Sequence, residues 1–293
     1  MPAHEPDAQV FEAQRPRLLR LAYRMLGSFA EAEDVVQDAW LRMQRSDDLI
    51  EVPAAWLTRV TTRLCLDRLR SARAQRETYI GPWLPEPIIE EEPGIDTDEL
   101  TFALMMALER LSPLERAAFL LHDVFGVTLA EIAETLGRDA AAVRQLAARA
   151  RKHVEAGRTR YPVDRAEADR IARAFFAAST TGDIGALRAM LAEDVVLHSD
   201  GGGRVIAFRN PIQGLQRVLR LFAGVSRKNR YSAKLIRSLT IDGLPGYISR
   251  DRGDVLQATM LDIADGKVRA IYIMRNPEKL GHVVGALGIS GEA

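Results

Sequence analysis

The sequence contains a single cysteine, Cys65, which excludes a disulfide framework and is typical of a reducing compartment. No run approaches the roughly 18 uninterrupted apolar residues that a membrane-spanning helix needs. The first residues, MPAHEPDAQVFEAQRPR, lack the apolar core of a secretory signal. An excess of charge is also missing, because 40 Lys and Arg residues balance 40 Asp and Glu residues. We therefore expect a cytoplasmic protein without a membrane segment, and net charge indicates no class of partner.

Metal and cofactor signatures are absent as well. The five histidines and Cys65 show no spacing typical of zinc ligands, so we expect no metal and no cofactor. Cys65 lies among arginines, which can lower a thiol pKa, but a packed helix thiol is favoured over a redox sensor. With 293 residues, 47% of them hydrophobic, the chain is expected to fold into two or three domains.

The pattern of residues 10–76 predicts helices only. Apolar residues recur at helical spacing over 18–25 and again over 35–43, and Gly27–Ser28 separates the two stripes. A third helix begins near Ala54, and from Arg59 to Arg76 it carries six arginines against one acid. Such a face is often only solvated, but next to Trp56 it is also typical of a surface that holds unpaired bases.

A proline-rich segment follows this helical part. It reads YIGPWLPEPIIEEEPGIDTDEL, with four prolines, and from Glu86 to Glu99 it holds seven acids and no base. Proline at this density excludes a regular helix, so the segment is expected to be a linker.

Residues 128–154 have the layout of a helix-turn-helix. Thr128 is placed to cap a first helix, Gly137 suits a tight turn, and Asp139 is placed to cap a second helix with a slim, alanine-rich start. From Arg138 to Arg160 there are seven basic residues and two acids, which suits contacts with phosphates and bases. The alternative is an ordinary helical hairpin with a solvated basic face.

From about residue 163 the pattern changes to α+β. Two helices, over 165–180 and 182–194, precede segments with strand-like composition that are bounded by DG, GG and PG turns. The expected strands are 195–200, 204–209, 231–241, 255–263 and 267–274, with a helix near 211–225 between them.

At this point the residues resemble a known family. LAYRMLGSFAEAEDVVQDAWLRM with AWLTRVTTRLCLDRLRS is similar to region 2 of bacterial sigma factors of the extracytoplasmic-function (ECF) group, and LSPLERAAFLLHDVFGVTLAEIAETLGRDAAAVRQLAARAR is similar to their region 4. The match covers about residues 10–155 in the family's order. It implies a transcription initiation factor, not an enzyme, that binds core RNA polymerase and directs it to promoter DNA.

The resemblance also implies roles for particular residues. Polymerase contacts fall on Glu33, Asp34, Gln37, Asp38 and Arg42. Recognition and melting of the −10 element fall on Asp47, Asp48, Trp56, Arg59, Thr62, Arg63 and Arg70. Reading of the −35 element falls on Arg138, Ala141, Ala142, Arg144, Gln145, Arg149, Arg151 and Lys152. Arg63 and Leu146 depart from residues common in the family, so no promoter sequence is carried over.

Three short motifs further resemble an ECF subgroup with a fused C-terminal SnoaL-like (NTF2-like) α+β cone. They are Trp83-Leu84-Pro85-Glu86-Pro87, Asp200-Gly201-Gly202-Gly203 and Asn276-Pro277-Glu278-Lys279-Leu280. The subgroup implies that this cone replaces a separate anti-sigma factor and modulates activity in cis. The motifs are expected to make its regulatory contacts, with Trp83 anchored in an apolar pocket and Asp200 hydrogen-bonded to the glycine backbone.

The expected organisation is therefore two all-α domains and one α+β domain. Region 2 spans 1–77, the linker 78–99, region 4 with its helix-turn-helix 100–160, and the SnoaL-like domain 161–293. The alternative is a SnoaL-like enzyme or small-molecule sensor fused to a DNA-binding module, because His198 and Asp200 share one face of a strand and could exchange a proton. Binding of an unidentified small ligand in the cone is a further possibility that the sequence leaves open.

Overall fold

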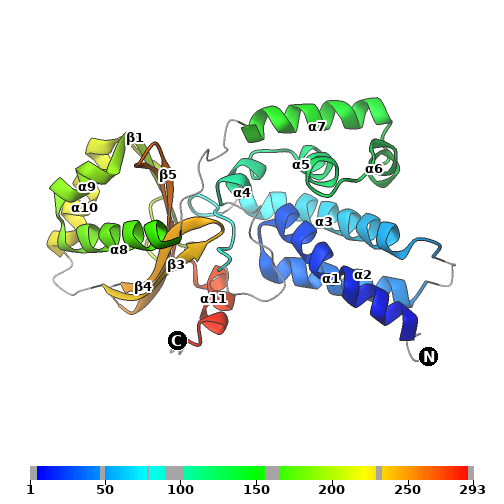
Figure 1. Cartoon of the computed structure of the whole chain (residues 1–293), viewed down its shortest axis with the longest axis horizontal. Coiled ribbons are helices and arrows are strands. Elements are labelled where there is room, and N and C mark those ends of the chain that lie inside the picture. The colour runs from blue at the N-terminus through cyan, green and yellow to red at the C-terminus, as the bar shows by residue number, and fades with distance from the viewer. Residues whose placement is uncertain are drawn as a thin grey trace. The chain divides into compact units, whose positions relative to one another are not determined.

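The computed structural model describes residues 5–46, 50–77, 79–89, 102–155, 165–228, 233–251 and 253–289. The chain divides into two compact units. The helical unit contains Met1–Glu77 and Leu104–Arg158, and the C-terminal unit contains Thr78–Ala103 and Thr159–Ala293. The segment Thr78–Ala103, which joins the two parts of the helical unit in sequence, thus belongs with the C-terminal unit. Figure 1 labels the elements of both units.

The helical unit consists of two helical parts. The first is formed by α1 (Glu5–Leu26), α2 (Phe29–Gln44) and α3 (Pro53–Glu77). The second is formed by α5 (Pro113–Phe119), the π-helical turn η1 (Leu120–Val124), α6 (Leu129–Leu136) and α7 (Ala140–Glu155). Helix α4 (Phe102–Leu108) crosses the division between the units. No helix of the described residues is long and apolar enough to cross a membrane.

The predicted helix boundaries of this unit are confirmed by their caps. Gly27 has a left-handed φ of 72°, and the Ser28 hydroxyl accepts a hydrogen bond from the Glu31 amide at 3.3 Å. Thr128 and Glu131 form a capping box at the start of α6. Gly137 ends α6 with φ 61°, and the Asp139 carboxylate accepts from the Ala142 amide at 2.7 Å. The helix-turn-helix therefore forms for the reasons its sequence indicates.

The C-terminal unit is a six-stranded sheet with helices on one face. Its strands are β1 (Leu191–Asp200), β2 (Ile212–Gln213), β3 (Lys234–Ile241), β4 (Leu244–Asp251), β5 (Val255–Ala264) and β6 (Lys267–Met274). They lie in the order β2-β1-β6-β5-β4-β3, and only the β1–β6 pair is parallel. Helices α8 (Arg165–Thr181), α9 (Ile184–Met190) and α10 (Leu215–Lys228) enclose a core with this sheet (Figure 1).

One strand predicted for this unit does not form, and a strand of eight residues was not expected. Residues 204–209 form no strand, because the amides of Arg204 and Val205 both donate to the Gly201 carbonyl and turn the chain back. Strand β4 was not expected, since Pro245-Gly246 suggested a turn, yet both residues lie inside it. Gly246 is required there because an added Cβ would lie 2.6 Å from the Thr259 carbonyl oxygen. Predicted turns at Asp242-Gly243 and Asp265-Gly266 are confirmed by positive φ at all four residues.

The linker segment 79–89 is part of this unit's architecture. Ile89 forms a β-bridge with Ile241, and the Asp242 amide donates to the Ile88 carbonyl at 2.9 Å. At the end of β1, Asp200 contacts this segment through the Tyr79 hydroxyl and the Leu84 amide. Leu84, Ile88 and Ile89 are fully buried. The apolar residues of the linker therefore extend the core of the C-terminal unit.

Candidate functional sites

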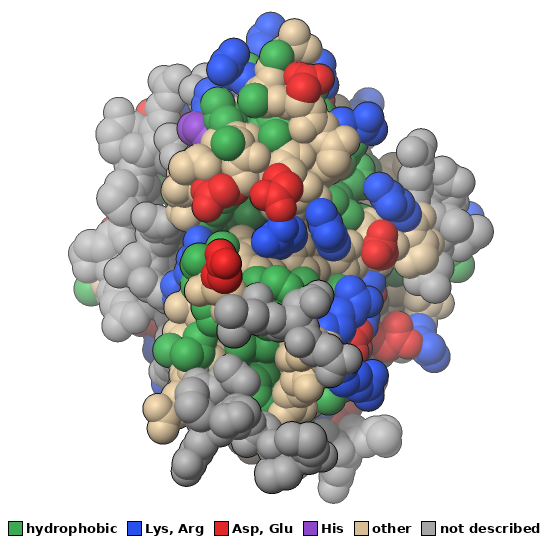
Figure 2. All heavy atoms as spheres, turned by 90° about the vertical axis from the view of Figure 1, so that its right-hand side faces the viewer, with side chains coloured by type: hydrophobic (Ala, Val, Ile, Leu, Met, Phe, Trp, Pro, Cys, Tyr) green, Lys and Arg blue, Asp and Glu red, His purple; other side chains and the backbone are tan. Residues whose placement is uncertain are grey.

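The proposed polymerase face lies on α2 opposite its buried stripe. Glu33, Asp34, Gln37 and Arg42 are exposed and Asp38 is half-buried, whereas the buried residues of α2 are apolar. Arg68 of α3 lies 3.3 Å from the Asp34 carboxylate and 3.7 Å from that of Asp38. On the side of the molecule drawn in Figure 2, whatever the element, Lys and Arg side chains are interspersed with Asp and Glu. The acidic face is therefore partly paired but accessible.

The residues assigned to the −10 element do not share one environment. Arg63 and Arg70 are exposed on α3, and Trp56 and Arg59 are half-buried. Thr62 differs from the expectation: it is fully buried and its hydroxyl donates to the Thr58 carbonyl at 2.8 Å. Its position on the inner face of α3 leaves it no accessible surface in this arrangement. Asp47 and Asp48 lie outside the described residues.

Two of these arginines contact the helix-turn-helix. Arg59 forms an ion pair with Glu134 of α6. Arg63 donates to the carbonyls of Thr135 and Glu134 at 3.2 and 3.3 Å. A cavity of about 840 Å³ beside them is lined by Trp56, Arg59 and Thr135 among others. The two arginines assigned to −10 recognition thus contact the C-terminal end of α6 in this arrangement.

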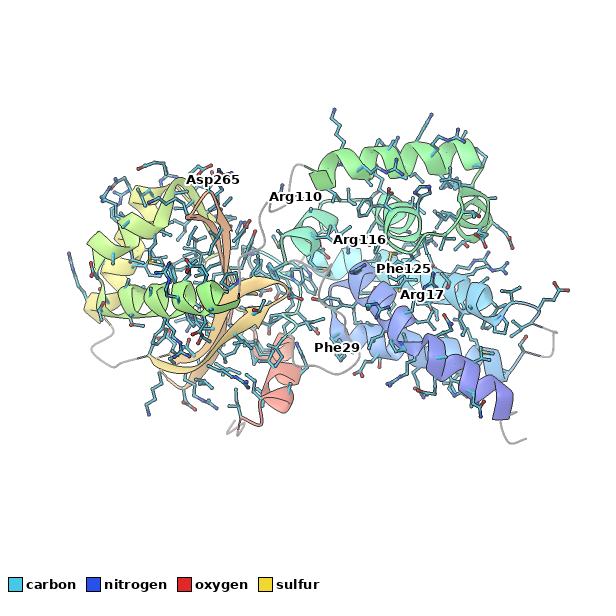
Figure 3. All side chains as sticks on the ribbon, viewed as in Figure 1. Arg17, Phe29, Arg110, Arg116, Phe125 and Asp265 are labelled. Carbon is cyan, nitrogen blue, oxygen red and sulfur yellow. The ribbon has the colours of Figure 1, made fainter. Side chains whose placement is uncertain are left out.

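A second set of contacts joins α1 to α5 and to Phe125, the residue that follows η1. The Arg17 guanidinium lies 5.3 Å from the centre of the Phe125 ring, and it donates to the Phe125 carbonyl at 3.3 Å and the Thr58 hydroxyl at 2.9 Å. Arg116 of α5 is buried and donates to the Met25 carbonyl at 2.6 Å and to Glu109 at 2.9 Å. Figure 3 labels Arg17, Phe125 and Arg116 in this part of the helical unit.

Most of the residues assigned to −35 recognition are exposed to solvent on α7 or just before it. Arg138, Ala141, Arg144, Gln145 and Lys152 are exposed, and Ala142 is half-buried. The two remaining arginines are engaged within the same unit. Arg149 pairs with Glu115 at 2.9 Å, and Arg151 pairs with Asp123 at 2.6 Å. These pairs orient α7 on α5 and η1, a role that helical periodicity alone did not indicate.

The three sequence motifs meet in one buried polar cluster. We call the group Tyr79, Leu84, Asp200, Asn276 and Lys279 the linker-binding cluster. The fully buried Asp200 carboxylate accepts from the Tyr79 hydroxyl at 2.5 Å, the Leu84 amide at 3.0 Å and the Gly202 amide at 3.0 Å. The expected bond between Asp200 and the glycine backbone is therefore confirmed. One carboxylate joins the linker to the turn after β1.

Lys279 completes this cluster from the third motif. Its ammonium donates to the Leu84 carbonyl at 2.6 Å and to Asp200 at 2.8 Å, and the side chain is only 5% exposed. Lys279 and Asp200 together therefore provide hydrogen-bond partners for both the backbone carbonyl and the backbone amide of Leu84. The ammonium also lies 3.2 Å from the centre of the Trp83 ring.

The anchoring residue of the linker differs from the prediction. Trp83 does not insert into an apolar pocket: it is half-buried, and it stacks on the Lys279 ammonium and packs edge-on against Tyr79 at 5.0 Å. Leu84 is the residue that is completely buried. A ring beside a buried cation gains electrostatic energy that an apolar pocket does not supply, which accounts for the arrangement.

Close backbone approach explains part of the glycine motif. An added Cβ on Gly202 would lie 2.5 Å from the Asn276 amide group, and Gly202 has φ 62°. Asn276 in turn donates to the Tyr79 hydroxyl at 3.1 Å and caps the short helix η2 (Pro277–Lys279). The glycine therefore lets Asn276 approach the linker.

The catalytic alternative for Asp200 and His198 gains no geometric support. The Asp200 carboxylate accepts hydrogen bonds from Tyr79, the Leu84 amide, the Gly202 amide and Lys279, which are donors of the linker-binding cluster and the glycine turn. The ring of His198 stacks on Tyr272 at 5.4 Å, and Phe102 packs on the same tyrosine at 4.8 Å. The carboxylate is thus a structural acceptor for the linker.

Burial affects two titratable groups that bear on the predictions. It raises the pKa of Tyr79, and the hydrogen bond to Asp200 raises it further, so the hydroxyl stays a donor. Burial also raises the pKa of the Cys65 thiol, which agrees with a packed thiol rather than a reactive one. No group of three or more His, Cys, Asp or Glu side chains among the described residues could hold a metal ion.

Two contributors to the linker site were not predicted. Tyr79 lies just before the motif, and Asp242 accepts from the Ile88 amide at 3.0 Å. No sequence signal distinguishes Asp242 from any other aspartate of a tight turn. The aromatic pair in TYIGPW was the available sign for Tyr79.

Comparison with known proteins agrees with this geometry. Residues 10–75 match the family Sigma-70 region 2, and residues 101–154 match Sigma-70, region 4. The ECF RNA polymerase sigma factor SigJ of Mycobacterium tuberculosis is 39% identical over 93% of this chain and 93% of that protein. The probable ECF RNA polymerase sigma factor SigI of the same species is 32% identical over 98% and 99%.

A solved structure extends the similarity to the whole fold. The crystal structure of the Mycobacterium tuberculosis extracytoplasmic function sigma factor SigJ matches with a TM-score of 0.74 and 34% identity, over 94% of this chain and 98% of that chain. Two helical sigma regions followed by an α+β domain therefore define a sigma factor of the sigma-70 class. Within that class, the chain belongs to the ECF RNA polymerase sigma factor family.

Proposed function

We propose that the C-terminal domain modulates this sigma factor in cis by binding the segment that connects region 2 to region 4. The observation that carries the proposal is the linker-binding cluster, in which Asp200 and Lys279 take up both polar groups of the Leu84 backbone. His282 adds a contact to the Pro87 carbonyl at 2.5 Å. The segment is thus bound through its backbone and through buried side chains.

Binding the linker limits the reach of the two sigma regions. A free chain spans at most about 3.3–3.6 Å per residue, so every linker residue bound by the domain shortens the available connection. Region 2 and region 4 must meet two separated promoter elements, and their separation depends on this connection. Release of residues 79–89 would lengthen it, whereas retention would restrict it. A separate anti-sigma factor is not needed for such control.

The expected result is higher transcription when the cluster is broken. Lys279→Met and Asp200→Ala should each raise run-off transcription by reconstituted polymerase from the promoter upstream of this gene. Arg204→Met is the matched control, because Arg204 pairs with Glu278 at an exposed site, where the side chains are 65% and 61% exposed. Equal transcription by all four proteins, at equal polymerase binding, would refute modulation through the cluster.

We also propose that the exposed acidic face of α2 binds core polymerase. Asp34→Lys with Asp38→Lys should weaken binding to core polymerase by about tenfold or more, since reversed charges repel the partner surface. Glu12→Lys in α1 reverses an exposed charge on another helix and should leave affinity unchanged. Fluorescence anisotropy of labelled sigma factor against core polymerase measures both. A similar loss for Glu12→Lys would show a general charge effect instead.

For promoter DNA, we propose that Trp56, Arg59, Arg63 and Arg70 serve the −10 element and the exposed residues of α7 serve the −35 element. Arg144→Ala should cost about 1–3 kcal/mol of binding and relax preference at one base pair. Lys152→Ala should weaken binding to all DNA sequences by a similar factor. It should also reduce the slope of log binding constant against log salt concentration by about 1. Fluorescence anisotropy with single-base promoter variants at several salt concentrations distinguishes base reading by Arg144 from phosphate contact by Lys152. A sequence-independent loss for Arg144→Ala would remove its reading role.

A further inference from the structure

The C-terminal unit contains a long stretch of sequence with charge of one sign. From Gly201 to Ile241 there are nine Lys and Arg residues and no Asp or Glu, although the whole chain has 40 of each kind. A surface that is only solvated usually carries both signs interspersed, whereas basic residues gathered on one element are typical of a surface that binds a polyanion. Helix α10 lies in the middle of this stretch.

Helix α10 presents a row of arginines on its outer face. Arg217, Arg220 and Arg227 are exposed, and with 3.6 residues per turn they lie within about 80° of one another around the helix axis. The rise of 1.5 Å per residue places the first and the last of them about 15 Å apart along that axis. The inner face of the helix is apolar and buried in the core of the unit through Leu215, Val218, Leu219 and Phe222.

Carboxylates of the protein do not neutralise this row. None of its three arginines forms an ion pair with another residue that the structure describes. Other exposed arginines of the same unit differ in this respect, because Arg170 and Arg173 of α8 and Arg269 of β6 each pair with a carboxylate three or four positions away. The charge on the outer face of α10 is therefore available to a partner that carries anions.

A glycine lies on the same face of α10, between Arg220 and Arg227. Gly224 is exposed inside the helix, where glycine costs about 0.5–1 kcal/mol relative to alanine. A Cβ added to Gly224 would meet no atom within 4 Å, so packing among the described residues does not require glycine at this position. Close approach of a ligand to the backbone is a reason for glycine at such a place. This observation is independent of the charges and indicates a partner on the same face.

Duplex DNA fits this face better than a membrane surface does. A helix that lies on a membrane inserts its apolar side between the lipids. The apolar side of α10 is occupied by the core of its own unit, where Phe222 packs edge to face on Phe175 with ring centres 5.6 Å apart. DNA needs only the charged side. A row about 15 Å long exceeds the width of the major groove, about 12 Å, so the arginines at its two ends can reach phosphates on both edges of the groove.

We propose that Arg217, Arg220 and Arg227 bind phosphates of duplex DNA, and that Gly224 lets the DNA backbone approach α10 closely. The C-terminal unit is then a third DNA-binding part of this sigma factor, beside regions 2 and 4. Helix α7 ends at Glu155 and α8 begins at Arg165, and a chain of that length spans at most about 36 Å, which is about one turn of DNA. We therefore place the contact on DNA next to the −35 element. This location rests on the proposed role of α7, whereas binding by α10 does not.

The salt dependence of DNA binding by the full chain tests the proposal, with fluorescence anisotropy of a labelled random-sequence duplex as the measurement. Each phosphate contact contributes about 0.9 to the slope of log binding constant against log salt concentration, so replacing all three arginines of α10 by Gln should reduce that slope by about 2.7. The matched control replaces Arg170, Arg173 and Arg269 by Gln, which removes the same charge from the same unit and should leave the slope unchanged. An unchanged slope for the α10 variant, or equal reductions in both variants, would overturn the proposal.

A second pair of variants tests the close approach without changing the charge. Gly224→Leu should weaken binding to the same duplex severalfold, because the larger side chain separates the DNA backbone from α10. Gly285→Leu is the control, since Gly285 is also exposed in a helix, α11 (Gly281–Ala286), and a Cβ there would likewise meet nothing within 4 Å. Equal affinity of the two leucine variants would show that DNA does not approach α10 at Gly224.

Two further measurements distinguish this site from the proposed −35 helix and from a membrane surface. Arg144→Ala combined with Lys152→Ala should weaken DNA binding in addition to the loss in the α10 variant. If this α7 variant binds DNA like the natural protein while the α10 variant does not, the proposed role of α7 fails and the α10 site stands. Vesicles of phosphatidylglycerol and phosphatidylcholine should bind the natural protein and the α10 variant equally. Vesicle binding that depends on the three arginines, without DNA binding that depends on them, would overturn the proposal in favour of a membrane surface.

Discussion

Replacing Lys279 by methionine is expected to lower the free energy of unfolding of the C-terminal unit by about 3–5 kcal/mol, the usual cost of breaking a buried ion pair from one side. Asp200 is fully buried and Lys279 is 5% exposed, so the substitution leaves a carboxylate without its ammonium partner and without water. The Leu84 carbonyl also loses its donor. Urea unfolding of the full chain, followed by circular dichroism, measures the change.

Two controls show whether the loss of stability comes from a buried unpaired charge or from the loss of any ion pair. Arg204→Met breaks an exposed pair, and such pairs are worth about 0–1 kcal/mol, so its unfolding should hardly change. Asp200→Asn combined with Lys279→Met removes both charges and should cost less than the sum of the single substitutions. If Lys279→Met unfolds like Arg204→Met, the ion pair does not stabilise the docked linker.

Arg116→Met is expected to have a similarly large effect on the helical unit, about 3–5 kcal/mol, because it leaves Glu109 without its buried partner. The Arg116 side chain is 3% exposed and that of Glu109 is 11% exposed. The same guanidinium donates to the Met25 carbonyl at the end of α1, so the substitution also removes a contact between the two helical parts. Region 4 should then separate more readily from region 2.

Arg110→Met is the matched control, since Arg110 is exposed near the same helix. Its unfolding should stay close to that of the natural protein. Hydrogen exchange should show faster exchange at the end of α1 and in α5 for Arg116→Met only. Equal exchange in both variants would mean that Arg116 does not hold these elements together.

Local sequence signals predicted the helical unit well because its elements are determined by neighbouring residues. Thr128 with Glu131 and Gly137 specify where α6 begins and ends, and a tertiary contact is not needed to recognise them. Strand β4 was missed for the opposite reason. Pro245-Gly246 indicates a turn locally, but pairing with neighbouring strands on both sides outweighs that preference.

The functional sites show the same difference between features set by local sequence and features set by tertiary contacts. The sequence by itself predicted the helix-turn-helix from its caps and turn glycine, and its resemblance to ECF sigma factors indicated the two sigma regions and the three motifs of the C-terminal extension. Only the tertiary structure decided that these motifs share one buried carboxylate, that Thr62 faces the core, and that Arg59 and Arg63 contact α6. Asp200 and Lys279 are 79 positions apart, and Tyr79 is 121 from Asp200. Contacts over such distances arise from how strands and linker pack, which no local pattern encodes.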